Sequence, residues 1–255
     1  MLVDTHAHLD FEDFDPDRDE VVRRAEAAGV GFILNPGIDA ATSRKAIALA
    51  GRYGSVYAAA GIHPNNAAAA RPGDMETIRE LAGSDRMVAV GETGLDFYRN
   101  RAPRETQLRM FREHLDLARE TGLPVIIHFR NAGFEGIEMT GLDRFTGVRG
   151  VFHCFGGSVH LAETLVDMGF FIGFDGPLTY PGSDRVDVAR AVPLERVLFE
   201  TDCPFLTPRS RRGERNEPSF VSEIAETFAR VRGIDGEKVI SVTGRNACEL
   251  FGLGA

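Results

Sequence analysis

The sequence predicts a (β/α)8 barrel, the TIM-barrel architecture, formed by a single domain over residues 1–255. The chain has 255 residues, and barrels of this kind routinely reach that length as one domain. Short apolar runs alternate with longer helical patterns along the chain, which is typical of repeated strand–helix units. Several runs, such as VAVG and PVIIH, are apolar almost throughout, as parallel strands covered on both faces are.

Eight apolar runs are predicted as the strands of this barrel. They span residues 2–6, 31–35, 56–61, 87–92, 124–128, 148–153, 170–174 and 196–202. Each strand is followed by a segment that can cross over to the next parallel strand. A doubly wound open sheet is the alternative, but the early strands lack the GxGxxG loop that binds phosphate in that fold.

The helices between these strands are indicated by their ends as well as by their periodicity. Proline stands near the start of several helical patterns and glycine follows the end of most, as the asymmetry of helix ends predicts. We predict helices over residues 16–28, 40–51, 74–83, 103–122, 158–169, 218–231 and 235–251. Several glycines in residues 131–146 obscure any helical pattern there.

The charge balance excludes a protein that binds nucleic acid through a generally basic surface. The chain carries 29 basic and 38 acidic residues, for a net charge of −9. With 43% apolar and 26% charged residues, the composition is that of an ordinary globular protein and not of a disordered, coiled-coil or collagen-like chain. Any polyanion must therefore be bound at a local site.

Cysteine usage and the N-terminal sequence predict a cytoplasmic protein that does not cross a membrane. The three cysteines have no CxxC spacing, which argues against a disulfide framework and a structural zinc site. The N-terminus lacks the basic start and apolar core of a signal peptide. The sequence also lacks an apolar run of the roughly 18 residues that a membrane span needs.

Six residues that could bind metal stand at or near predicted strand ends. His6 and His8 are two positions apart, so both imidazoles lie on one face of a strand. The other four end the fourth, fifth, sixth and eighth predicted strands: Glu92, His128, His153 and Asp202. A single histidine or carboxylate of this kind is more often a buried or capping residue, but the carboxyl ends of barrel strands converge on one face, where catalytic groups gather.

This donor set predicts two divalent metal ions. Four imidazoles and two carboxylates suit zinc, manganese, cobalt or nickel, with magnesium as a further candidate. Six ligands exceed what one tetrahedral ion uses, which indicates a two-metal site. The chain has only two lysines, Lys45 and Lys238, and both lie in predicted helices. A lysine bridge between the ions is therefore disfavoured, and Glu92, on the middle strand of the set, is the natural bridge.

The residues around these positions resemble the motifs of the TatD family of metal-dependent hydrolases. The matching segments are DTHAHLD (4–10), GIHP (61–64), GETGLDFYR (91–99), IHFRNA (127–132), HCFGGS (153–158), ETDCPFLTP (200–208), RGERNEP (212–218) and NACELF (246–251). The resemblance implies a TIM barrel with one ion on His6, His8, Glu92 and Asp202 and a second on Glu92, His128 and His153. The sequence departs from the family at Asn131, Gly157 and residues 180–183, in predicted substrate-facing loops.

The family resemblance implies hydrolysis of an ester bond in nucleic acid. Family members act on DNA, often as 3'-5' exonucleases that prefer single strands, and some remove D-amino acids from tRNA. We predict a deoxyribonuclease, with a D-aminoacyl-tRNA deacylase as the alternative. A small-molecule amidohydrolase and a non-catalytic scaffold are less favoured, because the mouth is rich in arginine and the ligand set is full.

Several further residues are assigned roles in this reaction. Asp202 and Glu92 are predicted to be catalytic as well as metal-binding, with Asp202 as a proton acceptor. His63 is predicted to contact phosphate or to protonate the leaving group, and Glu200, two residues before Asp202, to support the metal ligands from below. Cys154 and Cys203 are predicted to point away from the metals. His114 and His160 are predicted to lie on helix surfaces.

Arginines are the predicted contacts to substrate phosphates, because guanidinium binds phosphate in a bidentate manner. Arg99, Arg101 and Arg130 follow the fourth and fifth strands. The loop of residues 207–218 carries four arginines, including Arg211 and Arg212, against two glutamates. The local charge of +2 predicts that this loop attracts the anionic substrate toward the site. Unpaired bases could stack on aromatic residues near the mouth: Phe97, Tyr98 and Phe205. We expect a monomer.

Overall fold

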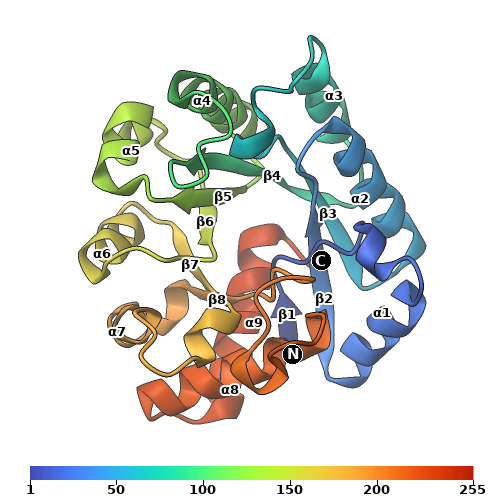
Figure 1. Ribbon diagram of the computed structural model, residues 1–255, viewed down its shortest axis with the longest axis vertical. Helices are drawn as coiled ribbons and strands as arrows, with labels where there is room; N and C mark the ends of the chain where they lie inside the picture. Colours follow the sequence, from blue (N-terminus) through green and yellow to red (C-terminus); the bar gives the residue numbers. More distant parts are fainter. Residues whose placement is uncertain (255) are drawn as a thin grey trace.

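The structure is a computed structural model that describes residues 1–254, and it contains one sheet of eight parallel strands (Figure 1). The strands follow one another in sequence order. They are β1 (Leu2–Asp4), β2 (Val30–Pro36), β3 (Val56–Ala60), β4 (Met87–Asp96), β5 (Val125–Arg130), β6 (Gly150–His153), β7 (Phe171–Phe174) and β8 (Val197–Phe199). The first and last strands meet where the Thr5 amide donates to Phe199 O at 3.0 Å and Ala7 bridges Cys203. The predicted barrel is confirmed.

The helices surround the strands, as Figure 1 shows. They are α1 (Arg18–Ala27), α2 (Ala40–Arg52), α3 (Asp74–Leu81), α4 (Arg104–Thr121), α5 (Gly133–Thr140), α6 (Val159–Asp167), α7 (Arg185–Ala191), α8 (Val221–Arg232) and α9 (Gly236–Phe251). The sequence did not predict α5, which contains glycine, or α7, which has only seven residues. Within residues 1–254, no helix has the length and apolar character required to span a membrane.

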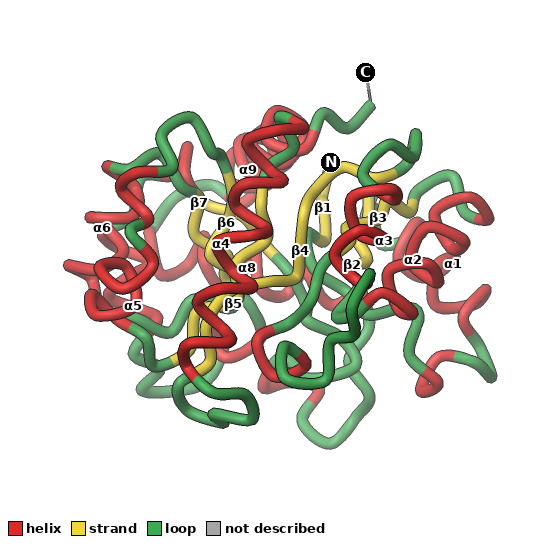
Figure 2. The backbone as a smooth tube through the Cα atoms, turned by 90° about the horizontal axis from the view of Figure 1, so that it is seen from above, coloured by secondary structure: helices red, strands yellow, loops and turns green. Residues whose placement is uncertain are grey.

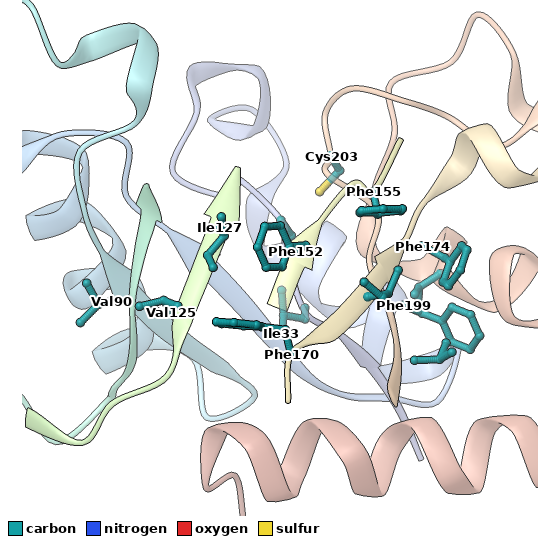
Figure 3. Close-up of a cluster of buried hydrophobic side chains, with 14 of the residues drawn as sticks. Ile33, Val90, Val125, Ile127, Phe152, Phe155, Phe170, Phe174, Phe199 and Cys203 are labelled. Atoms are coloured by element: carbon teal, nitrogen blue, oxygen red, sulfur yellow. The ribbon is translucent and has the colours of Figure 1, made fainter. Parts of the chain in front are cut away.

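The strand residues alternate between two apolar clusters. The outer cluster lies between strands and helices, and Figure 3 shows side chains of this cluster, including Ile127, Phe152 and Phe199 from β5, β6 and β8. The inner cluster contains Ile126, Val151 and Leu198, the neighbours of these residues along the strands. It also contains residues of α9, which contacts β1 and β8. Figure 2 shows α9 and both chain ends at the same end of the barrel.

The inward-facing positions of the strands pass from apolar to polar residues toward the other end of the barrel. Two residues after Ile126, β5 presents His128, and two residues after Val151, β6 presents His153. Because side chains two apart point to the same face of a strand, these histidines lie directly above the apolar layer. The alternation of the strands therefore places an apolar floor beneath a layer of chemically active groups.

Several strand ends differ from the sequence prediction, among them that of β5, which continues past His128 to Arg130. β4 does not stop at Glu92 but continues to Asp96, with a register shift between Val90 and Thr93 where it pairs with β5. β8 stops at Phe199, so Asp202 lies beyond the strand, with a positive φ of 53°. β1 likewise stops before His6. The apolar runs located these residues near the carboxyl ends of the strands, but polar side chains do not mark where strand pairing stops.

Candidate metal centre

One group of possible ligands gathers around the Oε2 atom of Glu92. His6 Nε2 lies 3.3 Å from Glu92 Oε2 and 3.7 Å from Asp202 Oδ1. His8 Nε2 lies 3.7 Å and 3.5 Å from the same two oxygens. The two Nε2 atoms are 3.3 Å apart. All four side chains are largely buried, with Asp202 the most exposed at 16%.

The backbone of this first group is fixed by pairing between the segments that follow β1 and β8. The Asp202 amide donates to His6 O at 2.8 Å, and the His8 amide donates to Cys203 O at 2.9 Å. Asp4 strengthens the pairing, because its buried carboxylate accepts from the Thr201 amide at 2.9 Å and the Thr201 hydroxyl at 2.6 Å. Burial raises the pKa of Asp4 to about 7, against the lowering effect of these hydrogen bonds. This role of Asp4 was not predicted from the sequence, although the residue belongs to the DTHAHLD motif.

A second group gathers around the other oxygen of the same carboxylate. Glu92 Oε1 lies 2.9 Å from both His128 Nδ1 and His153 Nε2, and these two nitrogens are 3.0 Å apart. His63 Nε2 lies 3.3 Å from Glu92 Oε1. The carboxylate of Glu92, 3% exposed, therefore stands between two sets of imidazoles.

The donor set fits divalent cations. Ligand atoms at about 2.0–2.1 Å from a tetrahedral ion lie about 3.3 Å from one another, which is the range of separations seen here. The inward-facing atoms of His6, His8 and Glu92 lie within 4.8 Å of one another, as do those of His63, Glu92 and His128 and those of His6, His153 and Asp202. Imidazole nitrogen and carboxylate oxygen are the ligands of zinc and similar ions. The six predicted ligands are thus brought together.

The titration of these groups is shifted by burial and by their mutual charges. Burial alone would raise the pKa of Glu92, but the histidine charges around it hold that pKa well below its usual range. Burial would lower the pKa of His8 and His128, but the carboxylates beside them raise each to about 9. Burial and the charge of His153 lower the pKa of His6 to about 4. Because a metal-binding imidazole must be neutral, cations compete with protons at His8 and His128.

Two carboxylates stand behind the histidines of the second group. Asp96 Oδ2 lies 3.5 Å from the outer nitrogen of His128 and accepts from Asn65 Nδ2 at 2.9 Å. Glu200 Oε1 lies 3.8 Å from the outer nitrogen of His153, and it also accepts from the Cys154 amide. Outer carboxylates of this kind orient metal-binding histidines. Glu200 is where the sequence predicted it. Asp96 was missed, although it stands four residues beyond Glu92 in the GETGLD motif.

His63 differs from the other histidines of the site in its proton position. Its Nδ1 accepts a hydrogen bond from the Asn65 amide at 3.0 Å, so a neutral ring carries its proton on Nε2, which faces Glu92. The segment after β3 that carries His63 is held by His114, whose Nε2 accepts from the Ile62 amide at 3.0 Å. His114 is fully buried, and burial lowers its pKa to about 4. The prediction that His114 lies on a helix surface was therefore wrong, whereas His160 is exposed as predicted.

A cavity of about 820 Å³ opens above the histidine cluster. Arg99, Arg101 and Arg130 line it, and the guanidinium of Arg130 lies 4.3 Å from the ring centre of Tyr98. Three phenylalanines also line the cavity: Phe11, Phe129 and Phe205. Phe11 stacks on His8 with ring centres 4.7 Å apart, and Phe205, 52% exposed, meets the edge of Phe11 at 6.0 Å.

The structure does not place Arg211 and Arg212 among the described residues that line the cavity. Arg211 Nε donates to Glu223 Oε1 at 2.9 Å, and its guanidinium covers the ring of Phe220 at 4.7 Å. Arg212 is exposed to solvent. Carboxylates of the chain itself therefore engage Arg211, and the predicted contact of Arg211 and Arg212 with substrate phosphates stays a prediction.

The two cysteines next to proposed ligands behave differently. Cys203 is fully buried in the outer apolar cluster (Figure 3), as predicted. Cys154 lines the cavity, and its thiol donates to Asp175 Oδ2 at 2.7 Å. Cys154 does not point away from the site as strand alternation predicts, because β6 ends at His153 and Cys154 has a positive φ of 48°. It therefore stands on the wall of the site.

The chain is similar to known proteins over nearly its whole length. Residues 3–252 match the family described as TatD related DNase. The chain is 40% identical over 252 residues to the uncharacterized metal-dependent hydrolase YabD of Bacillus subtilis (strain 168), covering 98% of this chain and 99% of that protein. It is 35% identical over 260 residues to the 3'-5' ssDNA/RNA exonuclease TatD of Klebsiella pneumoniae (strain 342), covering 99% and 98%. The crystal structure of YJJV, a TatD homolog from Escherichia coli K12, superposes with a TM-score of 0.93 and 32% identity, covering 99% and 98%.

Proposed function

The chain belongs to the family of TatD related DNases and is a metal-dependent hydrolase, and from this premise we propose that it removes nucleotides from the 3' end of single-stranded DNA by means of two divalent cations. The Klebsiella relative, whose name gives this direction and substrate, supports the proposal. We also propose that the protein acts in the cytoplasm, where its three free cysteines would stay reduced.

The observation that carries this proposal is the position of the Glu92 carboxylate. Its two oxygens face different sets of nitrogens, with His6 and His8 on one side and His128 and His153 on the other. Glu92 would therefore bridge two cations, with Asp202 completing the first set. Zinc, manganese, cobalt or nickel suits these imidazole and carboxylate donors, and magnesium remains a candidate.

The residues around the bridge divide the hydrolytic reaction between them. A pair of bound divalent cations supplies Lewis-acid polarisation of the phosphate and lowers the pKa of the attacking water. Asp202 lines the cavity and is more exposed than His6 or His8, so its carboxylate can accept the proton of that water. His63 carries its proton on the atom that faces the site, and this proton goes to the leaving oxygen of the nucleotide.

The cavity wall suits an unpaired strand of nucleic acid. Arg99, Arg101 and Arg130 offer charged donors to backbone phosphates. Phe11 and Phe205 present aromatic rings on which an unstacked base can lie. A single strand offers its bases and its phosphates to such a site at once, whereas a duplex keeps its bases stacked inside.

The test is an assay of the metal-loaded protein on four substrates: single-stranded DNA labelled at the 5' end, the same DNA as a duplex, D-aminoacyl-tRNA and a small neutral amide. We expect mononucleotides and a ladder that shortens from the 3' end, fastest on the single strand, and loss of all cleavage with a chelator. Deacylation of the tRNA without DNA cleavage would replace the proposal with the deacylase alternative. Hydrolysis of the amide alone would indicate an amidohydrolase.

His63→Gln tests the assignment of the proton donor. Glutamine is not acidic, so we expect cleavage of single-stranded DNA to fall by about 10²–10⁴-fold. A p-nitrophenyl phosphodiester needs no proton on its leaving oxygen, so its cleavage should fall far less. His160→Gln, at an exposed histidine, is the matched control. An equal loss on both substrates would show that His63 acts in another way, for example as a metal ligand.

A further inference from the structure

A charged cluster on the cavity wall is not used by the mechanism described above. It consists of Arg185, Asp175 and Cys154, which come from the start of α7, the residue after β7 and the residue after His153. Arg185 Nε lies 3.1 Å from Asp175 Oδ1, and the Cys154 thiol donates to Asp175 Oδ2 at 2.7 Å. Arg185 and Cys154 line the same cavity as the proposed ligands.

Asp175 is the fixed point of this cluster. Its side chain is fully buried, and a buried carboxylate is costly unless it is paired and hydrogen-bonded. Cys154 meets this need with a hydrogen bond to one oxygen, and Arg185 meets it with an ion pair to the other, without a hydrogen bond between Nε and Oδ1. The carboxylate therefore attracts the Nε edge of the guanidinium, and the two terminal nitrogens of Arg185 lie beyond this ion pair.

The terminal nitrogens of Arg185 have only weak partners within the described chain. Nη2 lies 3.8 Å from the Cys154 sulfur, and Nη1 lies 3.8 Å from a carboxylate oxygen of Asp184. The side chain of Asp184 is 80% exposed, so it can turn into solvent when another anion approaches. Both nitrogens thus have donor capacity to spare for a ligand in the cavity.

Arg185 also differs from the other arginines that line the cavity. Arg99, Arg101 and Arg130 are exposed, whereas the Arg185 side chain is only 17% exposed. An exposed arginine must be ordered when it binds a ligand, which costs conformational entropy, but Arg185 is already ordered. The exposed arginines are suited to attracting a polyanion, and Arg185 is suited to binding one phosphate in a defined position.

We propose that Arg185 is a specificity-determining phosphate contact, whose terminal nitrogens bind the non-bridging oxygens of the substrate phosphate that lies beside His153. The proposal rests on the proposed function for the identity of the substrate, a phosphodiester. It adds that the site selects phosphate esters over neutral esters and amides through this residue. Asp175 is the positioning residue that holds the guanidinium.

The first test measures binding of inorganic phosphate to the metal-loaded protein by titration calorimetry. Arg185→Gln should weaken this binding by about tenfold or more, because a hydrogen bond between two charged groups is lost. Arg185→Lys should recover part of the affinity, because lysine keeps the positive charge but lacks the two terminal guanidinium nitrogens that can bind two phosphate oxygens at once. Arg190→Gln, on the exposed side of α7 where Arg190 pairs with Asp187, is the control and should bind phosphate as the unaltered protein does.

A second variant guards against misfolding, because Arg185→Gln leaves Asp175 without its counter-ion. The double variant Asp175→Asn with Arg185→Gln removes both charges, and it should show the same loss of phosphate affinity with an unchanged metal content. The KM for single-stranded DNA should rise in parallel in both variants. Phosphate affinity in the double variant equal to that of Arg190→Gln would overturn the proposal.

The outcomes separate this proposal from the proposed function. Phosphate titration gives a result whether or not the protein cleaves DNA. Weakened phosphate binding in a protein that does not cleave DNA would support Arg185 and reject the nuclease. Normal phosphate binding in the variants of an active nuclease would reject Arg185 alone.

Discussion

The cluster around Glu92 and the arginine-rich loop of residues 207–218 are both dense in charge, but their charged groups have different partners. Within residues 1–254, Glu92 has only histidines within salt-bridge distance. In the loop, Arg215 forms a bidentate pair with Asp17 at 2.8 Å, and Glu217 forms one with Arg24 at 2.6 and 3.0 Å. The carboxylates of the first region face imidazoles that can bind metal, whereas Arg211, Arg215 and Glu217 of the second region pair with opposite charges of the chain.

This difference teaches how to interpret a charged motif. Charge in the loop attaches residues 215–217 to α1, and between the two ion pairs Asn216 donates to Thr201 O at 2.8 Å and Phe205 O at 2.5 Å. Those carbonyls flank Asp202, so the loop supports a proposed ligand and does not itself line the cavity. Carboxylates that face several imidazoles beside a cavity indicate a ligand site, whereas carboxylates paired with arginines away from the cavity indicate support.

Glu92→Gln should produce the largest effect, because it removes the negative charge that both imidazole sets share. A metal site contributes several kcal/mol of transition-state stabilisation, which corresponds to a loss of about a thousandfold in kcat. Metal content, measured by elemental analysis, should fall as well. Glu105→Gln, at an exposed glutamate of α4, is the control. Full metal content with normal kcat would remove Glu92 from its bridging role.

Asn216→Ala should have the next largest effect, by releasing the segment that carries Asp202. We expect metal affinity to fall by about 10–100-fold, as for other residues that orient metal ligands. Asn246→Ala is a matched control at the other end of β8, where Asn246 donates to Leu194 O at 2.9 Å and Val197 O at 3.0 Å. Both variants should be less stable to heat, but only Asn216→Ala should bind metal more weakly. Equal metal affinities would reduce Asn216 to a purely structural residue.

The barrel could be predicted from the sequence because its determinants are local. The apolar runs and the glycines after helices repeat along the chain, and β5 to β7 start within two residues of the predicted positions. The helix α5 was missed because its glycines lower intrinsic helix propensity. Close packing offsets this low helix propensity. Gly136 lies so close to Ala132 and Phe129 that a Cβ atom added to it would stand 2.7 Å from their side chains.

The proposed metal ligands could be predicted from the sequence, but the residues that support them and line the cavity could not all be predicted. His6, His8, Glu92, His128, His153 and Asp202 come together because the carboxyl ends of parallel strands meet at one end of a barrel. Asp96 and Arg185 were missed because their meaning depends on contacts between segments far apart in sequence, such as Asn65 with Asp96 and Asp175 with Arg185. For the same reason the sequence did not show that Arg211 pairs with Glu223, which lies in α8.

Glu217→Gln should lower stability moderately and change its pH dependence. Burial would raise the pKa of Glu217, but hydrogen bonds from Arg24 and Ser219 lower it below its usual value of 4.5. The carboxylate therefore stabilises the fold above that value, and the contribution is lost as the pH falls through the lowered pKa. We expect a loss of about 1–2 kcal/mol at neutral pH, reduced by the partial exposure of Arg24.

Urea unfolding from neutral pH to about pH 3 measures this contribution. The difference between the unaltered protein and Glu217→Gln should shrink as the solution becomes acidic. Asp187→Asn, in an exposed pair with Arg190, is the control and should change stability little at any pH. A difference that stays constant with pH would show that the effect of Glu217 does not depend on its charge.

The double variant Arg211→Ala with Arg212→Ala should have the smallest effect on substrate binding. Neither residue lines the cavity, and a surface arginine already paired with Glu223 has little to offer a distant phosphate.

Arg99→Ala with Arg130→Ala is the comparison, because both residues line the cavity. For single-stranded DNA each lost phosphate contact lowers the slope of log K against log salt by about 0.7. The cavity pair should therefore lose about 1.4 from that slope, and the loop pair should leave it unchanged. A reduced slope for the loop pair would mean that the strand continues beyond the cavity onto residues 207–218, and the contrast between the two regions would then fail.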